Sequence, residues 1–207
     1  MLFRSCAESG IGRVTVVPVA APCRAGTQLG GKRTFMLAGQ ERGVQVTTVY
    51  AEHSNNASLA MLTETGRAPL AGDDLNAYVG HANGFVLAFS NGLRVYLSGD
   101  TGIHTEMKSV VGDFHKANLV LLNYGSSAIS AYSATYAMNE LIKPAAVIAT
   151  QVNERATVGG KLRPESRTAA LVKMQKRPVH LAISGRTMEF DGKANCVAGC
   201  KIGRAHV

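Results

Sequence analysis

The segment at residues 93–102, Leu-Arg-Val-Tyr-Leu-Ser-Gly-Asp-Thr-Gly, constrains the fold more than any other, because it has the pattern of a buried strand that ends abruptly at glycines. An apolar run at 84–89 precedes it, and Asn91-Gly92 lies between the two runs. Asn-Gly in this position is the strongest local signal for a β-hairpin, since both turn residues must take positive φ. The sequence therefore predicts a hairpin over residues 84–98, with Asp100 just beyond its second strand.

A carboxylate at the carboxyl end of a strand is typical of a functional group, because α/β folds bind ligands beyond that end of the sheet. The alternative is that Asp100 only caps the helix that follows it. The motif alone favours neither interpretation.

Both ends of the chain have an unusual origin. Residues 1–5 and 201–207 are in-frame translations of the two strands of a common sequencing-adapter sequence. We therefore expect both segments to be library scars around an insert at residues 6–200, and we exclude them, His206 included, from fold reasoning. The natural gene product is then expected to continue in both directions.

Composition fits one globular domain, with 46% hydrophobic and 17% charged residues. The sequence contains no run of 18 or more apolar residues, so it predicts no transmembrane helix. The net charge of +8 falls to +5 when Arg4, Lys201 and Arg204 are excluded. The remaining basic residues are scattered, which indicates a solvated surface and no nucleic-acid partner.

The four cysteines leave the cellular compartment undetermined. None forms a Cys-x-x-Cys zinc knuckle. Cys196 and Cys200 could pair in an oxidising compartment or remain reduced.

The hydrophobic pattern predicts alternating strands and helices after a poorly defined segment at 6–43 and around a loop-like stretch at 54–80. The expected strands are 44–50, the two arms of the hairpin, 118–123, 145–149, 179–183 and 187–190. The expected helices cover 103–114, 134–142 before Pro144, and a segment from Pro164 to about Gln175. This order is typical of a mixed α/β layer in which helices cover a sheet.

Three of these strands are followed directly by polar residues: Glu52-His53-Ser54, Gly99-Asp100-Thr101 and Thr150-Gln151. Strand ends on one sheet can converge at a single edge, as metal ligands must. The three segments therefore form a candidate metal site.

The same segments carry a resemblance. Residues 50–56, Tyr-Ala-Glu-His-Ser-Asn-Asn, the hairpin into Gly-Asp-Thr-Gly, and residues 147–154, Val-Ile-Ala-Thr-Gln-Val-Asn-Glu, resemble the later motifs of the metallo-β-lactamase fold. The most similar branch is that of bacterial hydrolases related to ascorbate-6-phosphate lactonase. The resemblance covers residues 44–200 and makes that range a metallo-β-lactamase-like domain.

The resemblance implies a four-layer αββα sandwich with two zinc ions at one edge. His53 matches the third histidine of the first site, Asp100 matches the carboxylate that bridges both ions, and Gln151 stands where the family has the last histidine of the second site. In that family the cations lower the pKa of a bridging water, and the resulting hydroxide attacks an ester, lactone or phosphodiester in a small-molecule substrate.

The chain also departs from the family pattern. The first motif, His-x-His-x-Asp-His, is absent, since no two of the chain's histidines lie two residues apart. A neutral amide at Gln151 is a poor zinc ligand. Ser130-Ala131-Tyr132-Ser133 replaces a Gly-Pro-x-Glu-like turn. We therefore expect the C-terminal portion of the sandwich, with one sheet face uncovered, and no catalytic activity in this chain alone.

The other histidines have simpler interpretations. His81 either lines the cleft or belongs to the surface, and His104 is expected at the surface. His115 is expected at a helix end, where an imidazolium suits the dipole. His180 is expected to pack within a short strand.

Two other functions remain to be weighed. One is a degenerate metallo-β-lactamase-like domain kept for binding or structure without metals. The other, an aspartic protease, is suggested by Asp100-Thr101-Gly102 but disfavoured, because that mechanism needs two aspartates and a strand after the glycine. An amphipathic pattern follows here instead. The substrate, metal identity and oligomeric state are not reached from the sequence.

Overall fold

The computed structural model describes residues 3–6, 13–16, 29–36, 41–58, 76–78, 80–124, 129–152, 156–158, 161–182 and 185–200. Within these ranges, no helix has the length and apolar character needed to span a bilayer. The expected scar at 201–207 and the Asn-Glu that follows Val152 lie outside the described residues.

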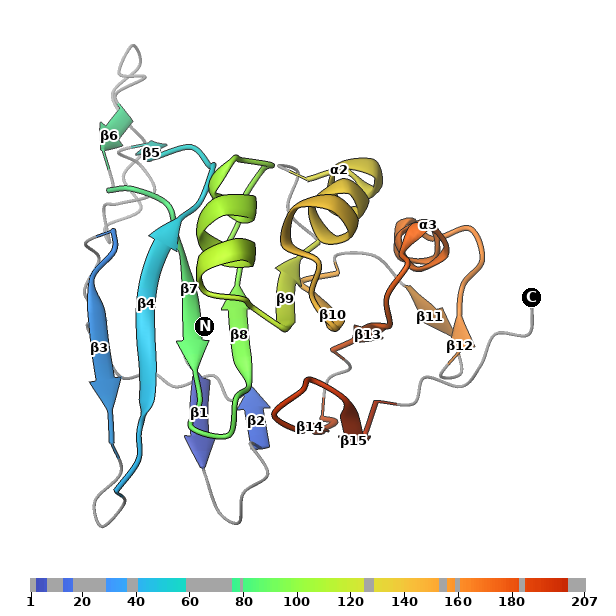
Figure 1. The fold of residues 1–207 in the computed structure, drawn as a ribbon. Coiled ribbons are helices and arrows are strands. Elements are labelled where there is room, and N and C mark those ends of the chain that lie inside the picture. The colour runs from blue at the N-terminus through green and yellow to red at the C-terminus, as the bar shows by residue number, and fades with distance from the viewer. Residues whose placement is uncertain are drawn as a thin grey trace, which may run out of the picture.

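A seven-stranded mixed sheet forms the centre of the structure, in the order β13-β10-β9-β8-β7-β4-β3 (Figure 1). Its strands are β3 (Lys32–Phe35), β4 (Val44–Tyr50), β7 (Asn83–Ala88), β8 (Arg94–Leu97), β9 (Leu119–Asn123), β10 (Ala146–Thr150) and β13 (Val179–Leu181). Strands β8, β9, β10 and β13 are parallel, while β3, β4, β7 and β8 pair antiparallel. The carboxyl ends of β4, β8, β9, β10 and β13 therefore all lie at one edge, and the predicted α/β class is confirmed.

The predicted hairpin is present, but its turn differs from the prediction. The loop has three residues, closed by a hydrogen bond from the Phe89 amide to the Leu93 carbonyl at 2.9 Å. Only Gly92 in this loop has positive φ, at 95°. A type I turn followed by a left-handed glycine is the usual three-residue solution, so Asn91 does not need the left-handed conformation expected for a two-residue turn.

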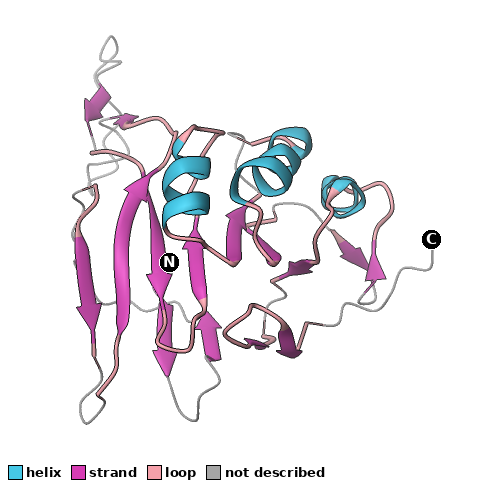
Figure 2. Cartoon of the chain, in the orientation of Figure 1, coloured by secondary structure: helices cyan, strands magenta, loops and turns pink. Residues whose placement is uncertain are grey.

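Helices line one face of the sheet (Figure 2). They are η1 (Met107–Phe114), α2 (Ala131–Tyr136), which continues as η2 (Ala137–Ile142), and α3 (Arg167–Met174). The serines at 130 and 166 cap α2 and α3, each accepting a backbone N–H three residues on. Helix α3 thus begins after Ser166 and not at Pro164.

Helix η1 is shorter and more widely wound than predicted. It begins at Met107, four residues after Ile103, and is π-helical; at its end the His115 amide bonds the Val110 carbonyl five residues earlier. Each such turn holds more residues than an α-turn. The wider winding moves Phe114 out of the predicted apolar face, and its side chain is 67% exposed.

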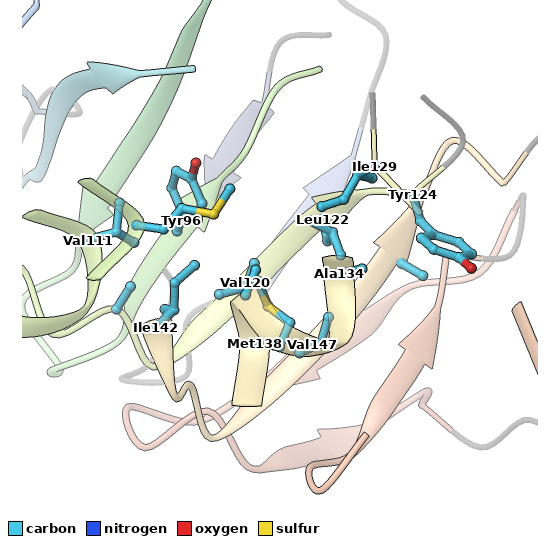
Figure 3. Packing of buried hydrophobic residues seen from close by; sticks show 14 of the residues in the cluster. Tyr96, Val111, Val120, Leu122, Tyr124, Ile129, Ala134, Met138, Ile142 and Val147 are labelled. Carbon is cyan, nitrogen blue, oxygen red and sulfur yellow. The ribbon is translucent and has the colours of Figure 1, made fainter. Parts of the chain in front are cut away.

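The main core lies between the helices and the sheet (Figure 3). Val120 and Leu122 of β9 and Val147 of β10 pack there against Ala134 and Met138 of the α2–η2 helix. These residues are at most 1% exposed. Near-continuous apolar runs such as β9 are expected for parallel strands buried on both faces.

A second sheet covers part of the opposite face. It has the order β1-β2-β14-β15, with β1 (Phe3–Cys6), β2 (Arg13–Val16), β14 (Met188–Phe190) and β15 (Cys196–Ala198). Phe190 packs with Val95, Leu121 and Ile148 in a buried cluster. The expectation of an uncovered face is therefore wrong over β8–β10, while Phe85 and Leu87 of β7 remain half-buried.

Two regions with weak sequence patterns contain short strands. The predicted loop at 54–80 includes the pair β5 (Asn56–Ser58) and β6 (Asn76–Tyr78). After β10, β11 (Thr157–Val158) pairs with β12 (Lys161–Leu162). Near the C-terminal end, Cys196 and Cys200 form a disulfide with their Cα atoms 6.2 Å apart, which decides between the two states left open by the sequence.

Candidate metal site

The candidate ligands lie at the same edge of the large sheet. His53 follows β4, Asp100 follows β8 and Gln151 follows β10, and these three strands run in the same direction. One strand separates β4 from β8, and one separates β8 from β10. With neighbouring strands about 4.8 Å apart, strand β8 itself lies roughly 10 Å from β4 and from β10. The shared edge predicted from the sequence is confirmed, and Asp100 is its central member.

Backbone hydrogen bonds join the His53 loop to the Asp100 loop. The Gly102 amide donates to the Glu52 carbonyl at 2.7 Å, and the Glu52 amide donates to Thr101 Oγ1 at 2.9 Å. The Thr101 hydroxyl donates in turn to the Gly102 carbonyl at 2.9 Å. Both backbone polar groups of Glu52 are therefore held by the two residues that follow Asp100.

The turn before Asp100 depends on Ser98 and Gly99. Ser98 Oγ accepts the Asn123 amide at 2.9 Å and donates to the Gly99 carbonyl at 2.7 Å, which ties the end of β8 to β9. Gly99 has φ 62°, and a Cβ there would lie 2.6 Å from the Asn83 carbonyl oxygen. Glycine is thus required for both the turn and the close approach of β7.

The candidate ligands themselves are exposed. His53 Nδ1 lies 3.2 Å from the Ser54 carbonyl oxygen. Gln151 takes φ 49°, a left-handed conformation that is uncommon for a residue other than glycine. Among the described residues, no group of three or more His, Cys, Asp or Glu side chains is placed to hold a metal ion.

Two buried amide oxygens alternate with the candidate ligands along the edge. Asn83 begins β7, between His53 and Asp100, and Asn123 ends β9, between Asp100 and Gln151. Within the described part of the chain, Oδ1 of each is buried and has no hydrogen-bond partner. Buried polar atoms are usually paired with protein, water or ligand, so these oxygens are available to a group bound at this edge.

Sequence reasoning missed a cluster next to His53. The Tyr50 hydroxyl donates to Glu52 Oε2 at 2.5 Å, and this hydrogen bond raises the pKa of Tyr50. The Tyr50 ring meets the His104 ring edge-on, with centroids 5.2 Å apart. The spacing of Tyr50 and Glu52 was the available signal, because residues two apart on an extended chain point to the same side.

His104 is half-buried, so its expected surface position is wrong. Neither ring nitrogen has a hydrogen-bond partner among the described residues. Burial lowers the pKa of His104, although Glu106 and Glu52 oppose that shift. The imidazole is therefore biased towards its neutral form beside the candidate site.

The other histidines lie in different surroundings. His81 is exposed just before β7. Burial, with Lys32 and Arg94 nearby, lowers the pKa of His115, which opposes the imidazolium expected at that helix end. His180 packs edge-on against Phe190 at 5.4 Å, as predicted.

Comparison with known proteins identifies metal-dependent hydrolases among the relatives of this chain. No family model matches the chain. A UPF0173 metal-dependent hydrolase from Cupriavidus taiwanensis is 31% identical over 163 residues, covering 78% of this chain and 53% of that protein. A UPF0173 metal-dependent hydrolase from Cupriavidus necator is 29% identical, with the same coverage. This chain is a relative of metal-dependent hydrolases.

The relationship predicted from the strand-end motifs is thus confirmed at the level of a metal-dependent hydrolase. The chain spans about half the length of the curated relatives it matches. Among solved structures, it is similar to the metallo hydrolase Igni18 from Ignicoccus hospitalis, at 19% identity and a TM-score of 0.49, covering 79% of this chain and 59% of that one. It is also similar to the metallo-beta-lactamase fold protein YhfI from Bacillus subtilis, at 10% identity and a TM-score of 0.45, covering 76% and 52%.

The donor set of this hydrolase relative fits a divalent cation on one side of Asp100 only. An imidazole at His53 and a carboxylate at Asp100 are ligand types that zinc binds well. On the other side, Gln151 and Asn123 offer neutral amide oxygens, which suit harder cations and are weak ligands for zinc. Among the described residues at this edge, those on the β4 side therefore have the chemistry to bind zinc, and those on the β10 side do not.

Proposed function

We propose that this chain is the C-terminal part of a zinc-dependent hydrolase of the metallo-β-lactamase fold that acts on a small ester, lactone or phosphodiester. The observation that carries the proposal is the placement of His53, Asp100 and Gln151 at one sheet edge, with Asp100 in the middle. A carboxylate between two other candidate ligands is suited to contact two cations. The metal-dependent hydrolases among its relatives support the same reaction class.

The chain's own residues would bind and orient the cations. A metal pair, when bound, supplies a water of lowered pKa as the nucleophile for hydrolysis. Asp100 would contribute the negative charge shared by the two cations, and the His53 imidazole would be one ligand of the cation on the β4 side. Tyr50 keeps its proton and orients the Glu52 carboxylate beside His53.

We also propose that the chain by itself does not turn over substrate. Catalytic zinc positions use about three protein ligands each plus a water, and only His53 and Asp100 are good zinc ligands among the proposed three. The His-x-His-x-Asp-His segment of the resembled family has no counterpart in this sequence. We propose that further ligands come from sequence outside this chain, as the resembled family's segment would supply.

Calorimetric zinc titration, combined with assays on a lactone, an aryl ester and a phosphodiester, tests this function. We expect less than two equivalents of zinc and no turnover for the chain as it is. Extension by its natural upstream sequence, together with Gln151→His, is expected to give two equivalents and metal-dependent turnover. Asp100→Ala in that extended protein should then remove most of the activity and one metal. Unchanged turnover and metal content in this variant would overturn the proposed function.

A second candidate is a degenerate domain that binds or supports a partner without metals. The exposed glutamine at position 151, in place of the expected histidine, favours this candidate. It predicts that even the extended Gln151→His protein binds no zinc. The same titration therefore separates the two functions.

A further inference from the structure

Thr101 has an unusual place beside the candidate metal site. It directly follows Asp100, its side chain is only 1% exposed, and its hydroxyl is fully engaged. Oγ1 accepts the Glu52 amide at 2.9 Å and donates to the Gly102 carbonyl at 2.9 Å. The Thr101 hydroxyl thus acts as both a hydrogen-bond donor and an acceptor. Valine has nearly the same shape as threonine but can neither donate nor accept, so it cannot replace these bonds.

These bonds join two strand ends that do not pair with each other. Strand β7 lies between β4 and β8, so the loops after β4 and β8 would lie roughly 10 Å apart if they simply continued their strands. The Thr101–Glu52 bond and the Gly102–Glu52 bond bring the loops together beyond the first residue of β7. We call these two bonds the Thr101–Glu52 clamp.

The clamp lies one residue from each proposed ligand. Glu52 immediately precedes His53, and Thr101 immediately follows Asp100. Because His53 and Asp100 are each bonded covalently to a clamp residue, the clamp restricts how far apart the Cα atoms of His53 and Asp100 can move.

We propose that Thr101 is a positioning residue that holds His53 and Asp100 at the separation a divalent cation requires. The inference rests on the proposed function, since it assigns Thr101 a role at that site. Partners that orient metal ligands from the outer shell typically change metal affinity by 10–100-fold when they are lost. Thr101 would act through the Glu52 backbone and would not touch the cation or the substrate.

The test uses the 207-residue chain with two readouts. Zinc is titrated while the His53 ring signals are followed by NMR, and hydrogen exchange of the Glu52 amide is measured without metal. Thr101→Val removes the hydroxyl at nearly constant volume, and Thr101→Ser retains it. Thr135→Val is the matched control, because Thr135 Oγ1 donates to the Ala131 carbonyl within α2 and takes no part in the clamp.

We expect Thr101→Val to speed exchange of the Glu52 amide and to weaken zinc binding at His53 by about 10–100-fold. Thr101→Ser should retain both properties to within a few-fold, and Thr135→Val should change neither. Where Thr101→Val does not fold, Thr101→Ala replaces it, since alanine removes the hydroxyl without a second methyl group.

Three results would overturn the inference: unchanged zinc affinity in the variants without a hydroxyl, an equal loss in Thr101→Ser, or zinc that leaves the His53 signals of the wild-type chain unmoved. The proposed function fails separately, through unchanged turnover and metal content of Asp100→Ala in the extended protein. The Glu52 exchange data would then still decide separately whether the clamp forms.

Discussion

The two sides of Asp100 are held in different ways. Towards β4, the neighbouring loop is fastened by the Thr101–Glu52 clamp and carries an imidazole at His53. Towards β10, the candidate ligand is Gln151, whose backbone is left-handed. A buried amide oxygen with no partner in the described structure lies on each side, at Asn83 and at Asn123. The β4 side therefore has an imidazole on a hydrogen-bonded backbone, and the β10 side has an amide on a strained one.

The difference lies in the loops: on the β4 side hydrogen bonds fasten the two loops to each other, whereas on the β10 side the backbone is strained at the candidate ligand itself. Strained backbone at a sheet edge persists where surrounding structure or function retains it. The left-handed residue Gln151 directly follows β10, so this strain lies at the edge that carries the other candidate ligands. Four changes test this comparison.

The largest expected effect comes from Asp100→Asn, which removes the charge shared by both sides. Zinc affinity measured by calorimetry should fall by more than about 100-fold, because the loss of a ligand exceeds the 10–100-fold typical of its outer partners. Asp113→Asn is the control, since Asp113 is an exposed carboxylate on η1 that pairs with Lys108 and is no candidate ligand. Equal zinc affinity in the two variants would contradict the central role of Asp100.

A gain is expected on the weak side from Gln151→His. Imidazole nitrogen is a better zinc ligand than an amide oxygen, so zinc binding on the β10 side should tighten by roughly 10–100-fold. Gln151→Asn keeps the amide and should leave the titration as it was. If histidine at 151 binds no better than asparagine, the assignment of that position as a ligand fails.

A smaller effect is expected on stability, and it distinguishes backbone strain at Gln151 from the proposed role of its side chain as a metal ligand. A left-handed φ costs an L-residue about 1–2 kcal/mol, and glycine removes this cost. Part of the gain is lost, because glycine gives the unfolded chain more conformational entropy. Gln151→Gly should therefore raise the free energy of unfolding by about 0.5–1 kcal/mol in urea titrations.

Lys143→Gly, at φ 58° after η2, should give a similar gain at a site with no proposed function. Lys173→Gly within α3 should instead lower stability by about 1 kcal/mol. If Gln151→Gly behaves like Lys173→Gly, the left-handed turn is not a source of strain.

The elements that were predictable from the sequence are those with local signals. Strand β9 was expected from its apolar run and β4 from its alternation, and the positions of His53, Asp100 and Gln151 after strands were sufficient to predict a common edge. Parallel strands bring their carboxyl ends together whatever their side chains are. The order of the strands was not needed for that conclusion.

What could not be predicted depends on contacts between distant residues. The Thr101–Glu52 bond joins residues 49 apart, and no local pattern indicates it. His104 is half-buried because the Tyr50 ring packs against it, although its own sequence neighbours suggested a surface position. The π-helical winding of η1 also escaped prediction, because its apolar spacing fits an α-helix equally well.

The smallest expected effect concerns pH and the His104 ring beside the clamp. Burial lowers the pKa of His104 below its ordinary value near 6.5. As pH falls through about 6.5, the unfolded chain takes up this proton before the folded one does, so stability falls from there down to the lower folded pKa. His104→Phe keeps the ring contact with Tyr50 and removes the proton, so its free energy of unfolding should decline less between about pH 7 and 5.5.

His81→Phe changes an exposed histidine and serves as the control. His115 and His180 also have lowered pKa values, and they add the same pH dependence of stability in both variants. A decline in His104→Phe as steep as in the control would mean that His104 is solvated, and that the side of the site nearest β4 is more open than its hydrogen bonds indicate.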